Sequence, residues 1–239
     1  MKVSIIIPVR NEESTIEKIV DQLENNLQAY PHEIIFINDF STDNTINVVN
    51  EIIKKKNQIN IFQNTKKGLG GAITTGIDKS SGDAICIMMS DLSDSIDDFK
   101  KYYSILKDED IDAVFGSRFI SGSKIIDYPK KKLILNRIFN LVTKLLFLSD
   151  YNDFTNAFKI YKKNSLLKTY PLVSESFNIF LELPLKVISR KMKYKIIPIS
   201  WSNRKMGISK FDIKELRAKY LFTLFYCFLE KLLLKKNKK

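Results

Sequence analysis

Apolar runs of strand length alternate with helix-like repeats through the first half of the chain. The apolar runs occupy residues 3–9, 33–38, 59–63, 83–89 and 112–117. Between them, apolar side chains recur with helical spacing, which predicts helices over residues 13–29, 43–55, 68–80 and 95–107. Almost continuously apolar strands separated by amphipathic helices are typical of a mostly parallel sheet with helices on both faces. We therefore expect an α/β fold.

The second half of the chain is less regular. We predict a loop over 118–132 and a strongly apolar helix over 133–148, whose polar stripe contains Asn136, Arg137, Asn140 and Lys144. The pattern then predicts a strand at 153–162, a helix at 174–191, a strand at 194–201, a basic loop at 203–210 and a last helix at 211–234. Residues 1–210 are expected to form one domain, and residues 211–239 a C-terminal amphipathic helix with a basic tail.

The last predicted helix has about ten consecutive, mainly apolar residues before Glu230 and Lys231 interrupt it, whereas a bilayer span needs roughly 20. We do not expect it to cross a membrane alone. Two placements stay open. Either the helix lies in a membrane interface with its lysines near anionic headgroups, or it packs on the domain or on a partner.

Polar and charged side chains directly follow several of the predicted strands. Arg10, Asn11 and Glu12 follow the first strand, Asp39 the second, Asp91 the fourth and Arg118 the fifth. In open α/β sheets, ligands bind beyond the carboxyl ends of the strands. The segment MMSDLSDS (88–95) therefore places carboxylates where such a fold presents its site.

The composition is ordinary except for the charge. The 239 residues are 44% hydrophobic and 28% charged, with a formal net charge of +12. This charge favours an anionic partner, or it reflects a solvated, lysine-rich surface. Carboxylates at the strand ends argue against nucleic acid, because without a metal they would repel phosphate. The single histidine, His32, argues against histidine-rich metal sites and a Ser-His-Asp triad, and the two cysteines lack metal-ligand spacing. The apolar run at the N-terminus is interpreted as a strand rather than a signal peptide.

The motifs along the chain carry a family resemblance. IIIPVRNEE, INDFSTDNT, KKGLGGAITTGI, SGDAICIMMSDLSD and VFGSRFISGS resemble successive motifs of family 2 glycosyltransferases. DFTNAFKIY, FLELPLKVI and IPISWSNRKMGISKF resemble the dolichol-phosphate, or polyprenyl-phosphate, mannosyltransferase branch. The resemblance covers nearly the whole chain and implies a GT-A fold, which is a Rossmann-like, mostly parallel sheet covered by helices on both faces.

The resemblance also implies a nucleotide-binding set. Its members are Pro8, Arg10, Asn11, Glu12, Asp39, Gly68, Ser90 and Asp91, with Asp39 contacting the base or ribose. Asp39 is alternatively a turn residue, and Glu12 alternatively caps the first helix. The turn at Gly68 either lets a helix N-terminus approach the nucleotide or allows tight helix–sheet packing. Arg204 and Lys210 match residues that grip the donor phosphates, in a basic loop that is alternatively an exposed turn.

One position departs from the family pattern. The branch has Asp-Ala-Asp after the fourth strand, whereas this chain has Met89-Ser90-Asp91, followed by Asp94. A departing nucleoside diphosphate needs a cation, and Mg²⁺ or Mn²⁺ prefers carboxylate oxygens. We expect Asp91 as the leading metal ligand, with Ser93 and Asp94 as further candidates, unless this segment merely caps the next helix. Because of Met89, either Asp91 and Asp94 share the cation with water and donor phosphates, or metal dependence is weakened.

The acceptor separates the functional hypotheses. A lipid monophosphate is already charged near neutrality and needs cations to hold it, for which Arg118, Lys132 and Arg137 are the candidates. A sugar hydroxyl instead needs a carboxylate base, for which Asp153 or Glu182 is the candidate. Asp153 alternatively orients the basic residues, and Glu182 alternatively anchors a helix.

The sequence thus predicts an inverting glycosyltransferase that moves a hexose, with mannose from GDP-mannose as the first choice, onto a dolichyl or polyprenyl phosphate. Asp91, Arg118, Arg204 and Lys210 are the candidate catalytic residues. The alternative acceptor is a saccharide hydroxyl in cell-envelope polysaccharide or glycolipid synthesis, and the rival class is a basic, non-catalytic membrane- or nucleic-acid-binding protein. The expected cofactor is Mg²⁺ or Mn²⁺. The expected partners are a GDP- or UDP-sugar and the lipid phosphate. The enzyme is expected to be peripheral on the cytoplasmic face of the membrane. Whether it also binds a membrane-spanning partner or a second copy of itself stays open.

Overall fold

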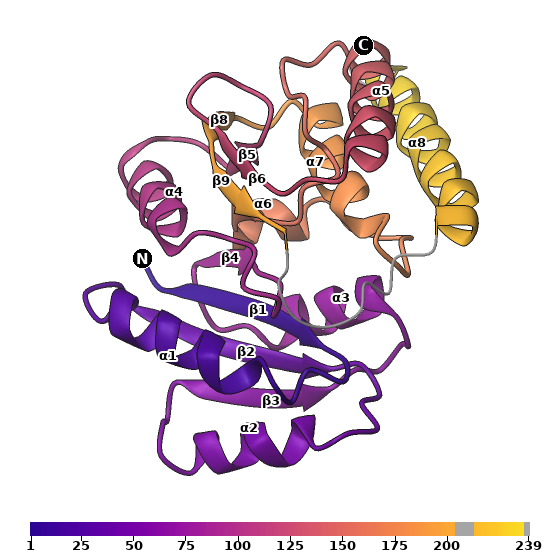
Figure 1. The fold of residues 1–239 in the computed structure, drawn as a ribbon. Helices are drawn as coiled ribbons and strands as arrows, with labels where there is room; N and C mark the ends of the chain where they lie inside the picture. Colours follow the sequence, from indigo (N-terminus) through magenta and orange to yellow (C-terminus); the bar gives the residue numbers. More distant parts are fainter. Residues whose placement is uncertain (204–212, 237–239) are drawn as a thin grey trace.

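A seven-stranded sheet runs through the centre of the molecule (Figure 1). The computed structural model describes residues 1–203 and 213–236, without the side chains of 213–217 and 235–236. Its strands are β1 (Val3–Val9), β2 (His32–Asn38), β3 (Ile59–Gln63), β4 (Ala84–Ile87), β5 (Ala113–Ser117), β7 (Lys159–Lys162) and β8 (Tyr194–Pro198). Their order is β3-β2-β1-β4-β7-β5-β8, and β7 alone runs antiparallel to its neighbours. The predicted α/β fold with a mostly parallel sheet is confirmed.

Helices cover both faces of the sheet, as expected. One face packs against α1 (Ile16–Leu27), α2 (Thr45–Ile53) and α4 (Ile96–Asp108). The other packs against α3 (Leu69–Lys79), α6 (Lys163–Leu167), α7 (Ile179–Ser189) and parts of α5 (Lys130–Phe147) and α8 (Ile213–Lys236). Along β1, Ile5 and Ile7 enter the first cluster and Ile6 enters the second, because successive side chains of a strand point to opposite faces. This two-sided burial explains why the strands are apolar throughout.

Two predictions between residues 118 and 202 are wrong. The predicted loop at 118–132 contains β6 (Lys124–Ile126) and the start of α5, and the predicted strand at 194–201 divides into β8 and β9 (Ser200–Ser202). The division occurs at Ile199, whose N–H donates to Ser117 and whose carbonyl accepts from Lys124. The chain thereby leaves the main sheet, and β9 pairs with β6 in a small parallel sheet.

Two further boundaries differ, and one helix was missed. The strand expected at 153–162 is limited to β7. Residues 154–155 form a turn in which the N–H of Asn156 donates to the carbonyl of Asp153, and the side chain of Asn156 accepts from the N–H of Phe158. The helix expected at 174–191 begins at Ile179, because the N–H groups of Val173 and Ser174 donate to the carboxylate of Glu182 instead. The short helix α6 was not predicted.

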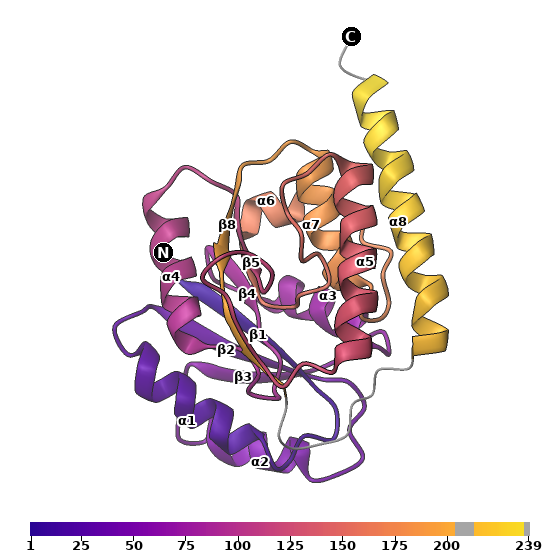
Figure 2. The same cartoon turned by 45° about the horizontal axis from the view of Figure 1, so that its top comes forward.

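Helix α5 is oriented with its polar stripe toward the protein. Asn140 is buried, and its side-chain oxygen accepts a hydrogen bond from the N–H of Phe154 at 2.6 Å. Thr143, one turn further on, is also buried. Helix α8 lies beside α5 (Figure 2). No helix in the described ranges has the length and apolar character needed to cross a bilayer.

Candidate active site

The predicted site residues that the structure describes lie mostly at one edge of the sheet. Strands β1, β2, β4 and β5 run in the same direction, so their carboxyl ends share that edge. Arg10 follows β1, Asp39 follows β2, Asp91 lies beyond β4 and Arg118 follows β5. Because β2, β1 and β4 are neighbours, Asp39, Arg10 and Asp91 come from three adjacent strands.

Asp39 holds the glycine-rich turn. One oxygen of its buried carboxylate accepts hydrogen bonds from the N–H of Gly68 at 2.8 Å and from the side chain of Asn64 at 2.7 Å. Gly68 has a φ of 113°, in the region that favours glycine. A Cβ at Gly68 would lie 2.4 Å from the carbonyl oxygen of Glu175, and the N–H of Gly70 donates to that oxygen. The turn is thus shaped by the 174–175 backbone, and the expected helix–sheet packing applies instead to Gly76, which lies against Ile6.

The loop after β1 is tied to the loop after β2. Asn11, with a φ of 54°, accepts a hydrogen bond from the N–H of Thr42 at 2.7 Å. The N–H of Glu12 donates to the hydroxyl of Thr45 at 2.9 Å. Pro8 is buried within β1, while Arg10 is exposed at the start of the loop. Asn11 and Glu12 therefore set the shape of this side of the edge, and Arg10 projects toward solvent.

The segment after β4 presents two carboxylates. One oxygen of Asp91 accepts the N–H of Ser93 at 3.2 Å, and Leu92 between them has a φ of 60°. Burial, and next the nearby charge of Asp91, raise the pKa of Asp94 to about 7. Ser90 and Ser93 are both buried, and the carbonyl of Ser93 accepts from Ser202 of β9.

This donor set fits a divalent cation. The carboxylate pair consists of hard oxygen ligands. Burial and next the charge of Asp91 raise the pKa of Asp94, while the N–H of Met89 and the charge of Arg118 offset the increase only in part. In the described part of the chain, no group of three or more acidic, histidine or cysteine side chains converges. Water and donor phosphates would therefore complete the coordination, as Mg²⁺ and Mn²⁺ commonly allow. Met89 instead packs against the apolar core, so it leaves the pair without a third carboxylate.

A buried arginine forms the centre of the next cluster. Arg118 donates from Nε and Nη2 to the two oxygens of Asp153, at 2.8 and 2.7 Å, and its backbone N–H donates to the same carboxylate. Its guanidinium lies 5.6 and 5.7 Å from the ring centres of Tyr128 and Trp201. Burial alone would lower the pKa of Arg118, but the charge of Asp153 outweighs it and raises the pKa further. Arg118 is therefore fixed in place and permanently charged.

A second arginine lies against the same phenylalanine ring as Arg118. The guanidinium carbons of Arg118 and Arg137 are 5.3 and 4.7 Å from the ring centre of Phe119. Arg137 is exposed on α5. Lys132 is exposed in the first turn of the same helix, more than one turn before Arg137. The structure thus brings Arg118 and Arg137 to one ring, whereas Lys132 lies nearer the start of α5.

The two candidate bases are both engaged in the interior. Asp153 is fully buried, and both of its oxygens accept from Arg118. Glu182 is fully buried on α7, where it accepts from the backbone of Val173 and Ser174 and pairs with Lys186 at 3.2 Å. These contacts fit the orienting role for Asp153 and the anchoring role for Glu182. Arg204 and Lys210 lie outside the described residues.

Sequence reasoning missed several residues that build the edge. Asp98 of α4 accepts the N–H of Ser200 at 2.6 Å and so holds β9 beside the carboxylates. Lys159 is fully buried and donates to the carbonyls of Phe154 and Asn156. Burial lowers its pKa to about 7. A lysine inside the apolar run AFKIY was the available signal for Lys159, whereas nothing local marked Asp98.

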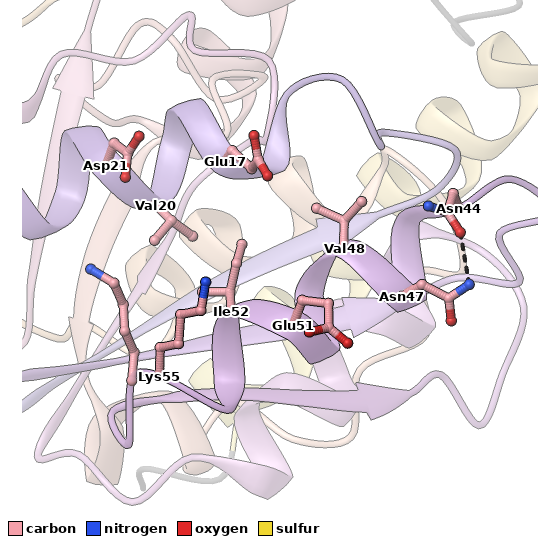
Figure 3. Close-up of a pocket in the computed structure, with 10 residues that line it drawn as sticks. Glu17, Val20, Asp21, Asn44, Asn47, Val48, Glu51, Ile52 and Lys55 are labelled. Carbon is pink, nitrogen blue, oxygen red and sulfur yellow. Dashed lines mark hydrogen bonds between the residues drawn. The ribbon is translucent and has the colours of Figure 1, made fainter.

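A separate groove lies away from this edge. It encloses about 340 Å³ between α1 and α2 (Figure 3). Glu17, Asp21 and Glu51 face it together with Lys55 and Lys56. It contains none of the predicted site residues.

A sheet of this topology, with paired carboxylates beyond β4 and a fixed arginine beyond β5, is typical of the class of GT-A glycosyltransferases. The chain belongs to glycosyl transferase family 2, whose model matches residues 4–169.

Relatives of known name support this membership. The chain is 28% identical over 213 residues to a dolichol-phosphate mannosyltransferase of Pyrococcus furiosus, covering 88% of this chain but 59% of that protein. It is 24% identical to a polyprenol monophosphomannose synthase of Mycolicibacterium smegmatis, covering 89% of this chain and 82% of the relative. The chain also covers 35% of the length of glycosyltransferase AglD of Haloferax volcanii, at 23% identity.

Solved structures share the fold. Glucosyl-3-phosphoglycerate synthase from Mycobacterium tuberculosis, crystallised with UDP, superposes with a TM-score of 0.69 at 17% identity over 95% of this chain and 80% of that one. The same enzyme with Mn²⁺ and UDP-glucose gives a TM-score of 0.70. At this identity the similarity shows the fold alone.

Proposed function

We propose that this chain transfers a hexose from a nucleotide diphosphate sugar to the phosphate of a dolichyl or polyprenyl lipid, with inversion at the sugar carbon. A lipid phosphate oxygen forms the new bond to C1 of the sugar, while the bond from C1 to the nucleotide diphosphate breaks. Mannose from GDP-mannose is the proposed donor, because two relatives are named as mannosyl or phosphomannose enzymes. The protein is proposed to act peripherally at the cytoplasmic face of a membrane.

The arrangement of cations carries this proposal. Arg118 and Arg137 flank one ring at the edge of the sheet, where an acceptor phosphate needs positive charge. A hydroxyl acceptor would instead need a free carboxylate base. Both oxygens of Asp153 are bound by Arg118, and Glu182 is fully buried, so neither candidate base is available. This observation favours the lipid phosphate over the saccharide hydroxyl.

The nucleotide sugar is proposed to bind beyond the carboxyl ends of β2, β1 and β4. Asp39 and the Gly68 turn form the proposed nucleoside side, and Asp91 with Asp94 is proposed to hold Mg²⁺ or Mn²⁺ against the diphosphate. The cation would offset the charge that develops on the departing diphosphate. Arg204 and Lys210 stay proposed donor-phosphate ligands.

A radiolabelled transfer assay tests the proposal. The protein is incubated with Mg²⁺ or Mn²⁺, a polyprenyl phosphate in detergent and labelled GDP-mannose, with UDP-glucose in parallel. We expect acid-labile label in the organic phase, with the nucleoside diphosphate released in equal amount. If no donor labels the lipid while a soluble saccharide is extended, the acceptor is a hydroxyl and the proposal is wrong.

A further inference from the structure

The outer side of α5 is apolar although the helix lies on the protein surface. Leu141 is 56% exposed and Leu145 is 64% exposed, whereas Asn140 and Thr143 are buried. The exposed apolar residues recur with helical spacing as Ile134, Leu135, Ile138, Leu141, Val142, Leu145 and Leu148. This is the reverse of an ordinary surface helix, which turns its apolar stripe toward the core.

Helix α8 shows a similar outward stripe. Phe222 is 62% exposed and Phe225 is 61% exposed, while Thr223 and Cys227 are buried against the domain. The exposed apolar residues of this helix are Leu221, Phe222, Phe225, Leu229, Leu232 and Leu233. Because its inner side is already packed, the exposure does not reflect a detached helix.

The two stripes belong to neighbouring helices that run in parallel. The rings of Phe139 and Tyr220 are 5.7 Å apart, and those of Phe147 and Phe228, eight positions further along each helix, are 6.1 Å apart. Figure 2 shows α5 and α8 side by side at one side of the molecule. We call the thirteen exposed apolar residues of these stripes the α5/α8 surface.

Such a concentration of apolar side chains is unusual. Elsewhere in the described ranges, only Phe40, Ile46, Ile126 and Leu167 are comparably exposed large apolar residues, and they are dispersed along the chain. Large contiguous apolar patches on folded proteins mark surfaces that contact a partner or a membrane.

We propose that the α5/α8 surface docks onto an anionic lipid bilayer, with both helices lying in the boundary between headgroups and acyl chains. The charges around the surface favour this occupant. Lys130, Lys131 and Lys132 are exposed in the first turn of α5, which contains no acidic residue, and the sequence KKNKK begins at residue 235, within the last turn of α8. Glu230 of α8 turns inward to Arg190. Anionic headgroups compensate these lysines, whereas a second copy of the chain would bring the same positive charge.

The polar side of α5 connects this surface to the site. Arg137 lies over the ring of Phe119, which also contacts Arg118, and Asn136 donates to the hydroxyl of Tyr128 at 3.3 Å. If the proposed function holds, a lipid acceptor with its chain in the bilayer would present its phosphate to Arg118 and Arg137. The connection rests on that function, but docking itself does not.

Vesicle flotation tests docking without any donor or acceptor. The full chain is mixed with vesicles of phosphatidylcholine, with or without phosphatidylglycerol, and centrifuged through a density gradient. We expect the protein to float with the anionic vesicles and to bind less tightly as salt is raised. Absence of flotation with anionic vesicles would overturn the proposal.

Paired substitutions test whether the two helices share the surface. We expect Leu141→Ser with Leu145→Ser on α5, and separately Phe222→Ser with Phe225→Ser on α8, each to lower the partition constant by about tenfold or more. The matched controls are Ile46→Ser and Leu167→Ser, which remove exposed apolar residues elsewhere and should float as the wild type does. Circular dichroism verifies that every variant is folded; these side chains are exposed, so the fold should survive.

Two outcomes would contradict the surface. If either paired variant floats as the wild type does, the proposal that both helices contact the bilayer is wrong. A protein that does not float but forms a dimer, which both paired variants dissociate in light scattering, has a second copy as its occupant instead. Flotation that depends on both helices, together with no glycolipid from any donor, leaves docking supported and refutes the proposed function alone.

Discussion

At the scale of single residues, the carboxylate pair beyond β4 has a clear electrostatic imbalance. Asp94 is held near Asp91, and the negative charge of Asp91 is the second cause of its raised pKa after burial. A divalent cation would remove this repulsion while it binds donor phosphates. The pair therefore keeps a possible metal site although Met89 contributes no ligand.

Asp91→Asn should weaken binding of GDP or UDP in the presence of Mn²⁺ by about two orders of magnitude, because one of two carboxylates for the cation is lost. Isothermal titration calorimetry with and without Mn²⁺ measures the change. Asp97→Asn is the matched control, since Asp97 is exposed in the first turn of α4 and pairs with Lys100. Equal Mn²⁺-dependent affinity in Asp91→Asn and the wild type would contradict the metal role.

Arg118→Lys should destabilise the fold by about 3 kcal/mol, because lysine cannot donate two parallel hydrogen bonds and Asp153 is fully buried. The only tryptophan, Trp201, lies against Arg118, so its fluorescence follows unfolding in urea. Arg137→Lys is the control, because Arg137 contacts the same Phe119 ring from an exposed position and should cost less than about 1 kcal/mol. Similar losses in both variants would refute the special position of Arg118.

At the scale of elements, the sequence predicts what is local. Each strand of the first half is an uninterrupted apolar run, and each helix there has one apolar stripe, so both could be located without tertiary information. The β6–β9 pair could not, because the β6 segment has no strand pattern and nothing in the apolar run 194–201 indicates that its end leaves the main sheet to pair with β6. The stripes of α5 were visible as well, but periodicity does not reveal which stripe faces the protein. That choice depends on Asn140 reaching the backbone of Phe154.

The site shows the same division. The carboxyl-end rule placed Asp39, Asp91 and Arg118 at one edge, since it needs only strand order along the chain. The partners of these residues lie far away in sequence: Asp153 is 35 positions from Arg118, and Gly68 is 29 positions from Asp39. Nothing in the local sequence specifies such contacts, so the hydrogen bonds between Arg118 and Asp153 could be found only in the folded structure.

Glu182 links two elements to the glycine turn. It fixes the backbone at Val173 and Ser174, and the adjacent carbonyl of Glu175 accepts from Gly70. Glu182→Gln should cost about 3 kcal/mol, because it leaves Lys186 as a buried charge with a weaker partner. Chemical denaturation measures the loss, and the double variant with Lys186→Met should recover part of it. Strictly additive losses in this double-mutant cycle would show that the two side chains do not interact.

At the scale of the whole molecule, the two edges of the sheet have different tasks. The carboxyl edge holds the proposed site, and the amino edge holds a separate cluster around Glu33. This buried carboxylate accepts from Lys2, Ser4 and Ser81, at 2.8, 2.5 and 2.7 Å, and so joins the starts of β1 and β2 to the turn before β4. These residues lie at the opposite ends of the strands from the proposed site, so changes in this cluster should affect stability without affecting substrate binding.

The pH dependence of stability tests this separation. Burial would raise the pKa of Glu33, but the hydrogen bonds from Lys2, Ser4 and Ser81 outweigh it and lower the pKa from 4.5 to about 2. A carboxyl group with a lowered folded-state pKa stabilises the fold above its unfolded pKa, and this contribution is lost as the pH falls from about 4.5 to about 2.

Glu33→Gln should therefore reduce the free energy of unfolding at pH 7 by about 3 kcal/mol, and the difference from the wild type should shrink as the pH approaches 2. Urea unfolding at a series of pH values measures both. Glu17→Gln is the control, because Glu17 is exposed on α1 and should show neither effect. Nucleotide affinity should be unchanged in Glu33→Gln at pH 7, since the cluster lies at the opposite end of the strands. A loss of affinity in a folded Glu33→Gln protein would mean that the two edges are coupled through the sheet.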